Sequence, residues 1–338
     1  MNTPRARSEA AFEALRARYL AFARNEAKGV SPLYEELAVA VAASEGLLAF
    51  VSSLPGPKQQ PNLVFAAVRH LYGTPADARH FAVLVERNPE PIRRLVLGRS
   101  TQTNEPGRCA VLLPALALLP QPLALLEVGA AAGLCLLPDW YGYDYGRKQL
   151  RPRHSGAHPA PVFPCRASEA TPIPDEIPEI AWRAGLDLNP VNVADPEEAA
   201  WLETLVWPGN EARAERLRAA LHIACERPVP VVTGDLLTDV SALAATAPAG
   251  ATLVIFHSAV LAYVSPEVGE RFAALVRDLG AVWISNESPR VLPAVAAKLR
   301  EPPRKDQFLL AVDGRPVAAA GPHGQLIDWF DGSFAEPG

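Results

Sequence analysis

The sequence has few of the features that mark exported or disulfide-bonded proteins. Only four cysteines occur in 338 residues, none of them in a C-x-x-C pair, and three lie in apolar surroundings where a thiol behaves as a small hydrophobe. The N-terminal segment MNTPRARSEAAFEAL lacks the apolar run of a signal peptide and is typical of an amphipathic helix. We therefore expect reduced thiols and a cytoplasmic location.

Positive charge is scarce as well. The formal net charge is -5 and the pI is near 5.9, which argues against binding to a phosphate backbone. One long apolar stretch, residues 109–138, is interrupted by Pro114, Pro120, Pro122 and Glu127, so we interpret it as a helix, a turn and a buried strand. We expect neither nucleic acid nor a membrane as a partner, and the sequence leaves the oligomeric state open.

Signatures of several enzyme classes are absent. The chain has no G-x-S-x-G, no Walker phosphate loop and no H-E-x-x-H. His154 and His158 are four residues apart, with Cys165 beyond them, but Gly156 and Pro159 argue against a helix that would present them together. We therefore expect no metal site.

The first part of the chain has the pattern of a helical domain. Up to residue 119, apolar residues recur at helical spacing, and Ser31 before Pro32 predicts the start of a helix. The predicted helices are 8–25, 32–51, 62–72 and the buried segment 109–119. We interpret residues 1–119 as a helical cap domain.

From residue 120 to residue 338 the pattern changes to short apolar runs separated by longer amphipathic stretches. The runs are 123–128, 229–234, 251–256, 281–285 and 308–312. This alternation predicts an α/β fold with a doubly wound, mainly parallel sheet, which is a Rossmann-like domain. The last run is followed by Asp313 and Gly314, which predict a C-terminal antiparallel hairpin. Residues 141–181 lack clear periodicity and form a predicted irregular insertion.

The run LALLEVGAAAGL (123–134) places a carboxylate, Glu127, just before a glycine-rich turn. Ligands of open α/β sheets bind beyond the carboxyl ends of the strands, so we predict a cofactor on this turn at Gly129, Ala131 and Gly133. The spacing is not that of a dinucleotide site, and a carboxylate here would repel a pyrophosphate. It would favour a cationic cofactor such as S-adenosylmethionine. The alternative is that Glu127 accepts hydrogen bonds from loop amides.

Two further acids follow predicted strands. Asp187, in GLDLNP, is expected to grip ribose hydroxyls, and Asp235, directly after the third run, is expected to reach an adenine edge. Either side chain could instead cap the next helix.

Several segments together have a recognisable pattern that runs over nearly the whole chain. They are STQTNEPGR (100–108), LLEVGAAAGLCLL (125–137), YGYDY (141–145), RAGLDLNPVNV (183–193), WLETLVWPGNEARAERLRAAL (201–221), GDL (234–236), FHSAVLAYVSPE (256–267) and WISNES (283–288). In them the chain resembles the class I S-adenosylmethionine-dependent methyltransferases, and more closely the uncharacterised bacterial family called domain of unknown function 2332. At three positions it departs from that family's usual residues, with Ala131 for Ser, Cys135 for Asn and Asn192 for Asp. The resemblance implies S-adenosylmethionine as the cofactor, bound at the retained glycines and Glu127.

Substrate-binding residues are expected in STQTNEPGR, the most polar segment of an apolar neighbourhood. Gln102, Asn104, Glu105 and Arg108 offer more donors and acceptors than a helix cap requires, so we predict a polar lining. The alternative is that Thr103 or Asn104 caps the helix after it and Arg108 pairs with Glu105.

Candidate catalytic groups follow the fourth run. His257 could deprotonate a hydroxyl or an amine, because its pKa lies near neutrality, and Tyr263 lies nearby. Histidines at strand ends are also common as hydrogen-bonded structural residues. Tyr143 in the insertion and Glu287 after the fifth run are further predicted substrate contacts.

These observations predict an S-adenosylmethionine-dependent methyltransferase that acts on an unidentified small or medium-sized acceptor in a cleft between the helical and α/β domains. The alternative is a non-catalytic metabolite-binding or interaction protein with the same fold. A nicotinamide oxidoreductase is disfavoured by the missing middle glycine and by the terminal hairpin.

Overall fold

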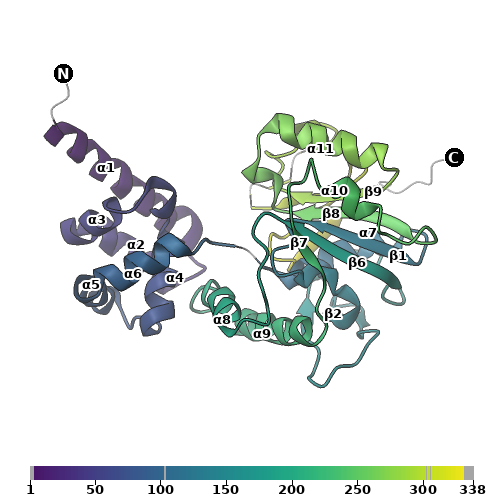
Figure 1. The fold of residues 1–338 in the computed structure, drawn as a ribbon, viewed down its shortest axis with the longest axis horizontal. Helices are drawn as coiled ribbons and strands as arrows, with labels where there is room; N and C mark the ends of the chain where they lie inside the picture. Colours follow the sequence, from purple (N-terminus) through teal and green to yellow (C-terminus); the bar gives the residue numbers. More distant parts are fainter. Residues whose placement is uncertain (1–3, 103, 302, 305, 331–338) are drawn as a thin grey trace. The chain divides into compact units, whose positions relative to one another are not determined.

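The computed structural model describes residues 4–102, 104–301, 303–304 and 306–330 (Figure 1). The chain divides into two compact units, one formed by residues up to 103 together with 195–215, the other by 104–194 and residues from 216 onward. The boundary thus lies before the predicted residue 119. The reason is α7 (Cys109–Ala117), which is buried along its length and packs against a strand of the α/β unit.

The helical unit is built from short helices with well-defined starts. In order they are α1 (Pro4–Phe22), the π-helical turn η1 (Ala23–Ala27), α2 (Pro32–Ala43), α3 (Glu45–Ser52), η2 (Gly56–Lys58), α4 (Pro61–Tyr72), α5 (Ala78–Arg87), α6 (Pro89–Gly98) and α8 (Pro196–Thr204). The predicted start at Ser31 is confirmed, because its hydroxyl accepts from the Tyr34 amide and Pro32 is the first helical residue. The predicted single helix 32–51 was wrong, because Ser44 caps a second helix by accepting from the Leu47 amide.

An aromatic cluster holds this unit together. Tyr34, Phe65 and Phe81 are fully buried, with the ring centroid of Phe65 5.1 Å from Tyr34 and 5.4 Å from Phe81. Trp201 of α8 belongs to the same core, and its indole N–H donates to the Ser100 carbonyl. This packing explains why residues 195–215, distant in sequence, belong to the helical unit.

The second unit contains a nine-stranded sheet, in the order β5-β12-β11-β10-β9-β8-β1-β6-β7. The strands are β1 (Leu123–Val128), β5 (Arg166–Ala167), β6 (Ile180–Asp187), β7 (Val231–Thr233), β8 (Thr252–Ser258), β9 (Val282–Glu287), β10 (Phe308–Val312), β11 (Arg315–Ala320) and β12 (Leu326–Trp329). The five strands from β7 to β9 run parallel, in the doubly wound order in which the chain reverses direction beside β1. The predicted mixed α/β architecture with a mostly parallel sheet is confirmed.

Alternation along the strands gives the two faces of the sheet different characters. Leu126, Ile255 and Trp283 point to one face and pack with Phe272 and Val276 of α11 (Pro266–Asp278). The short helix α10 (Val240–Ala244) covers the same core (Figure 1). Neighbouring residues in each strand therefore point to the opposite face. We call the α11 side the helix face and the other side the glutamate face, because it carries Glu127.

The C-terminal hairpin is confirmed. β10 pairs antiparallel with both β9 and β11, and the two-residue turn between β10 and β11 has positive φ at Asp313 (+50°) and Gly314 (+69°). Positive φ at both central residues matches the right-handed twist of the flanking strands. β12 and β5, which extend the sheet beyond this hairpin, were not predicted.

The remaining helices and short helical turns lie in the connections before, between and after the strands. They are η3 (Pro106–Arg108), η4 (Leu134–Leu136), η5 (Pro138–Trp140), α9 (Glu211–Glu226), η6 (Leu261–Tyr263) and α12 (Pro293–Ala296). The insertion forms a small sheet, β3-β2-β4, from β2 (Gly142–Asp144), β3 (Gln149–Leu150) and β4 (Val162–Pro164). The apolar stretch 109–138 contains α7 and β1, as predicted. None of the described helices is long and apolar enough to span a membrane.

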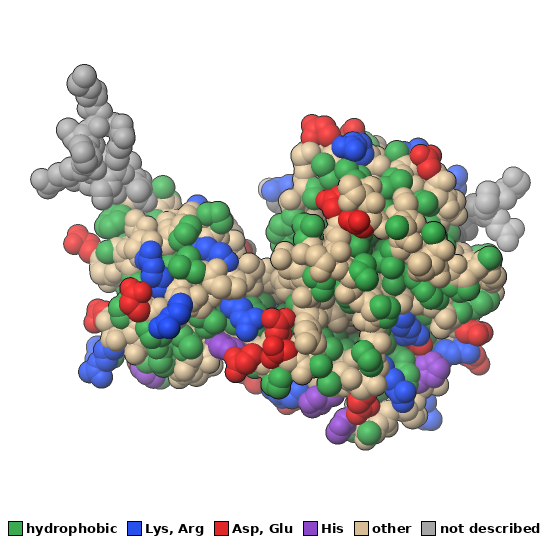
Figure 2. All heavy atoms as spheres, viewed as in Figure 1, with side chains coloured by type: hydrophobic (Ala, Val, Ile, Leu, Met, Phe, Trp, Pro, Cys, Tyr) green, Lys and Arg blue, Asp and Glu red, His purple; other side chains and the backbone are tan. Residues whose placement is uncertain are grey.

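The outer surface carries charges of both signs. On the face shown in Figure 2, acidic and basic side chains are interspersed among apolar ones. This mixture agrees with the small formal net charge of -5.

The hairpin turn yields a stability prediction. Gly314→Ala places a Cβ on a residue at φ +69°, and we expect a loss of about 1–2 kcal/mol in the free energy of unfolding. Gly250→Ala is the matched control, because a Cβ there meets open space and its φ is not positive. Urea unfolding of both variants measures the difference, and equal midpoints would contradict the assignment of the turn.

Candidate functional site

The turn after β1 lies where the strand order reverses. Gly129 has φ +72° and its N–H donates to the Leu186 carbonyl at 2.7 Å. A Cβ at Gly129 would lie 2.3 Å from a methyl group of Val260, so the loop after β8 packs directly on the turn. Ala131 also has positive φ, +47°, which is costly for a residue with a side chain. The turn is thus a strained, closely packed feature at the edge of the sheet where ligands bind in such folds.

Asp187 holds this turn in place. One carboxylate oxygen accepts from the Ala131 amide at 2.8 Å and the other from the Asn189 amide at 2.7 Å. The carboxylate therefore ties the turn after β1 to the loop after β6. Both oxygens can accept further hydrogen bonds, so the predicted contact with a ribose stays a prediction.

The polar segment before α7 reaches the same turn. The Asn104 side-chain oxygen accepts from the Ala132 amide at 2.8 Å, while its buried Nδ2 has no partner. Glu105 accepts from the Gly107 amide and forms an ion pair with His323, with Nδ1 3.4 Å from the carboxylate. Gln102 belongs to the helical unit. The structure thus brings one of the predicted lining residues, Asn104, into contact with the glycine turn. Thr103 lies outside the described residues.

Glu127 is the acidic group at this site that the protein leaves partly unsatisfied. It is 6% exposed, and its Oε2 is buried without a hydrogen-bond partner. Burial raises the pKa of Glu127 well above its usual value, with Cys135 and Asp187 adding to the rise and Arg108 opposing it. The loop amides go to Asp187 and Asn104 instead, so the alternative prediction, that Glu127 accepts from them, finds no support in the hydrogen bonds.

Arg108 brings a buried positive charge to the same face of the sheet. Its side chain is held by two backbone carbonyls, with Nη1 2.9 Å from the Ser258 oxygen and Nε 3.0 Å from the Pro322 oxygen. The predicted alternative, an ion pair of Arg108 with Glu105, is not formed. No carboxylate of the described residues lies within 4.0 Å of this guanidinium. Arg108 is 6% exposed, so its charge is almost wholly removed from water.

His257 does not have the geometry of the predicted general base. It is fully buried on the helix face, opposite Glu127, and its Nδ1 lies 2.7 Å from Glu287. The Trp283 indole N–H donates to Nε2 at 3.0 Å, and because an indole only donates, Nε2 must be unprotonated. Both ring nitrogens are therefore engaged, and no lone pair is left for a substrate.

Glu287, a predicted substrate contact, organises the loop after β8. Its Oε1 accepts from the Val260 and Leu261 amides at 2.8 and 3.0 Å as well as from His257. Burial would raise the pKa of Glu287, but these hydrogen bonds hold it below its usual value. The pair His257–Glu287 thus positions the residue, Val260, that packs on Gly129.

The other predicted residues lie apart from this cluster. Tyr263 is 85% exposed on η6, while Tyr143 is buried in the insertion and donates to the Pro138 carbonyl at 2.7 Å. Asp235 accepts from the Leu237 amide at 2.8 Å, in the turn before α10, whose N-cap residue is Asp239, so it does not cap that helix. Its predicted contact with an adenine edge stays a prediction. Gly133 has φ +68° and closes the turn by donating to the Ala130 carbonyl.

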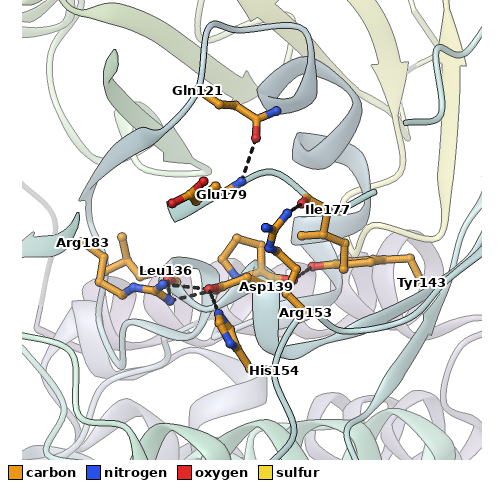
Figure 3. A network of polar contacts seen from close by, with 10 residues as sticks. Gln121, Leu136, Asp139, Tyr143, Arg153, His154, Ile177, Glu179 and Arg183 are labelled. Atoms are coloured by element: carbon orange, nitrogen blue, oxygen red, sulfur yellow. Dashed lines mark hydrogen bonds and ion pairs between the residues drawn. The ribbon is translucent and has the colours of Figure 1, made fainter. Parts of the chain in front are cut away.

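Sequence reasoning missed the buried network around Asp139 (Figure 3). Arg183 donates to both carboxylate oxygens at 2.8 Å, and His154 Nε2 lies 3.1 Å from one of them. Because Arg183 projects from β6 and Asp139 lies in η5, this pair fastens the start of the insertion to the sheet. An arginine in the middle of the mostly apolar run 180–186 was the available signal.

A cavity of about 300 Å³ adjoins the glycine turn. Its lining is mostly apolar and comes from Ala132, the loop 190–194 and residues 224–231 at the end of α9 and the start of β7. Val191 of this loop donates its N–H to the Ala131 carbonyl, so the cavity and the turn share a wall. Among the described residues, no group of three or more His, Cys, Asp or Glu side chains is arranged to hold a metal ion.

The buried acid has a predicted cost in stability. Because its folded pKa lies above the unfolded value, Glu127 destabilises the protein increasingly as pH rises from the unfolded pKa to the folded pKa, and fully above it. We therefore expect Glu127→Gln to gain about 1–3 kcal/mol in the free energy of unfolding at pH 8 and little at pH 4.5. Urea unfolding at both pH values measures this, with the exposed Asp328→Asn as control. An equal effect at both pH values would show that Glu127 is not a buried acid of raised pKa.

Comparison with known proteins identifies the family. No curated protein matches the chain. A family described as uncharacterised proteins conserved in bacteria matches residues 16–329, which include both units. The chain therefore belongs to this bacterial family, domain of unknown function 2332 (DUF2332).

Proposed function

We propose that this protein is an S-adenosylmethionine-dependent methyltransferase that acts on an unidentified small or medium-sized acceptor. The observation that carries the proposal is Glu127, a buried carboxylate whose Oε2 has no partner, at the carboxyl end of β1 beside a strained glycine turn. A buried group left unsatisfied by the protein is costly, and a ligand that donates to it removes this cost.

The negative charge of the Glu127 carboxylate favours some cofactors over others. A nicotinamide or flavin dinucleotide would bring a pyrophosphate to the turn, where Glu127 would repel it. A ligand with an ammonium and a sulfonium group instead supplies positive charge to an acid in a medium of low dielectric, where attraction is strong. The strand order from β7 to β9 places this acid at the position where doubly wound folds bind their ligands.

The cavity beside the turn supports the same ligand. Its mostly apolar lining, from Ala132 to Val231, suits a flat ring such as adenine, and about 300 Å³ is ample for one base. Asp187 accepts from the Ala131 amide, next to Ala132, which lines the cavity. A nucleoside with a cationic tail would therefore meet an apolar cavity at one end and an acid at the other.

When bound, the cofactor supplies an electrophilic methyl group. The residues of this chain bind and orient, because direct displacement needs chiefly alignment of the nucleophile, the methyl carbon and the sulfur. With both nitrogens of His257 engaged, the acceptor's proton leaves to water or to the acceptor's own groups. The same observation favours the second candidate, a non-catalytic metabolite-binding protein.

Calorimetric titration tests the proposal. We expect S-adenosylmethionine and S-adenosylhomocysteine to bind and NAD to give no heat of binding. Glu127→Gln removes the charge but keeps the shape, and we expect it to weaken binding about ten- to hundredfold, since a buried hydrogen bond to a charged group is worth about 1.5–3 kcal/mol. Asp328→Asn on β12 should bind like the wild type. Equal affinity in Glu127→Gln and the wild type would overturn the site assignment.

Cofactor binding should also depend on pH. Because burial raises the pKa of Glu127 in the free protein and a cation beside it favours the ionised form, binding should release protons at pH values where Glu127 is partly protonated. We expect the affinity for S-adenosylhomocysteine to rise with pH as Glu127 ionises in the wild type and to stay flat in Glu127→Gln. Titrations in two buffers of different ionisation enthalpy measure the released proton directly. A wild-type protein that takes up protons or exchanges none would contradict this prediction.

A further inference from the structure

Two opposite charges are buried at this site without pairing with each other. Glu127 and Arg108 are each 6% exposed. Oε2 of Glu127 has no hydrogen-bond partner, and within 4.0 Å of the Arg108 guanidinium the described residues hold no carboxylate. A buried charge without a partner is expensive, and two such charges of opposite sign normally relieve the cost by pairing. Here the structure keeps them apart.

The separation follows from the sheet. Glu127 on β1 is in register with Phe256 on β8, and Arg108 binds the carbonyl of Ser258, two residues further along. With strands about 4.8 Å apart and a rise of about 3.3 Å per residue, the Cα atoms of Glu127 and Ser258 are about 8 Å apart. The side chains of Glu127 and Arg108 both lie on the glutamate face. Their charged groups are therefore separated by a short distance at the carboxyl edge of the sheet.

Arg108 cannot readily move across this span, because it is anchored. Its Nε and Nη1 donate to the Pro322 and Ser258 carbonyls, and the guanidinium carbon lies 5.8 Å from the ring centre of Phe308. The Ser258 end is itself fixed, since the Asn286 side chain donates to the Ser258 hydroxyl at 2.9 Å.

The anchored guanidinium still has capacity for a ligand. It carries five N–H donors, of which two are used by these carbonyls, so three have no partner among the described residues. A planar array of free donors that includes Nη2 suits a carboxylate, which arginine binds by two parallel hydrogen bonds.

We propose that Arg108 binds the carboxylate of a ligand whose ammonium group is bound by Glu127, so that the site recognises the zwitterionic end of a free α-amino acid. One ligand then compensates both buried charges, which neither the protein nor a singly charged ligand does. The rest of that ligand rests on the proposed function, in which the amino-acid end belongs to S-adenosylmethionine. Arg108 becomes a specificity-determining residue, since a ligand without the carboxylate leaves the guanidinium unpaired.

The test compares ligands that differ in one charged group. S-adenosylhomocysteine and its decarboxylated amine analogue are titrated into the wild type, Arg108→Met and Glu127→Gln. We expect the wild type to prefer the carboxylate-bearing ligand at least tenfold. Arg108→Met should lose about ten- to hundredfold in affinity for S-adenosylhomocysteine and should bind both ligands alike. Glu127→Gln should bind both more weakly and keep the preference for the carboxylate.

Two further variants separate recognition from folding. Arg153→Met is the matched control, because Arg153 also donates to a backbone carbonyl, that of Ile177, but lies in the insertion. It should keep the wild-type preference. Arg108→Lys retains the charge without the planar fork, and we expect a smaller loss of preference than in Arg108→Met. This variant keeps the test decisive if Arg108→Met does not fold.

The outcomes distinguish this inference from the proposed function. If S-adenosylhomocysteine binds and Arg108→Met and Arg108→Lys keep the full preference for the carboxylate, the role of Arg108 is overturned and the function stands. If the nucleosides do not bind but L-methionine or L-homocysteine binds in a manner that Arg108→Met abolishes, the zwitterion site stands and the proposed function falls. Absence of binding by the nucleosides and by both amino acids overturns both.

Discussion

The conformation of the turn after β1 is the constraint on which the site depends. Gly129 leaves no space for a side chain, because Val260 from the loop after β8 occupies it. Asp187 fixes Ala131 from the side of β6, and Asn104 fixes Ala132 from the segment before α7. Contacts from three separate parts of the chain thus hold one short turn in a strained backbone conformation.

The polar residues at the carboxyl edge of the sheet have two different roles: some hold the backbone of the loops by hydrogen bonds, and others have charges that no opposite charge in the described part of the chain compensates. Glu287 supports the loop after β8 through three hydrogen bonds, and Asp187 supports the turn through two. Glu127 Oε2 has no hydrogen-bond partner, and Arg108 is bound by two neutral carbonyls and by no carboxylate among the described residues, although both side chains are buried. Supports lower the cost of ordering the backbone, whereas Glu127 and Arg108 raise the free energy of the unliganded protein. A site that is rigid around unsatisfied charges loses little entropy when a complementary ligand binds.

The sequence predicted the architecture better than the roles of single residues. Apolar runs between helical stretches indicated the parallel strands, and Asp313-Gly314 indicated the hairpin, because these signals are local. Which unit contains α7 or α8 depends on long-range packing, such as that of Trp201 in the helical core. The role of His257 was also beyond local reasoning. It depends on strand register, which places His257 and Glu127 on opposite faces although both lie near the ends of adjacent strands.

The opposite orientation of these two residues has a consequence for the chemistry of the site. A base on the helix face cannot reach a ligand bound at Glu127 on the glutamate face, because the sheet lies between them. His257, fixed between Glu287 and Trp283, is linked to the glycine turn only through Glu287 and the loop that carries Val260. Any transfer at this edge therefore relies on alignment and on the reactivity of the acceptor itself. Such a mechanism depends on how precisely the ligand is bound and aligned. The strained turn and the unpaired charges of this structure lie at the same edge of the sheet.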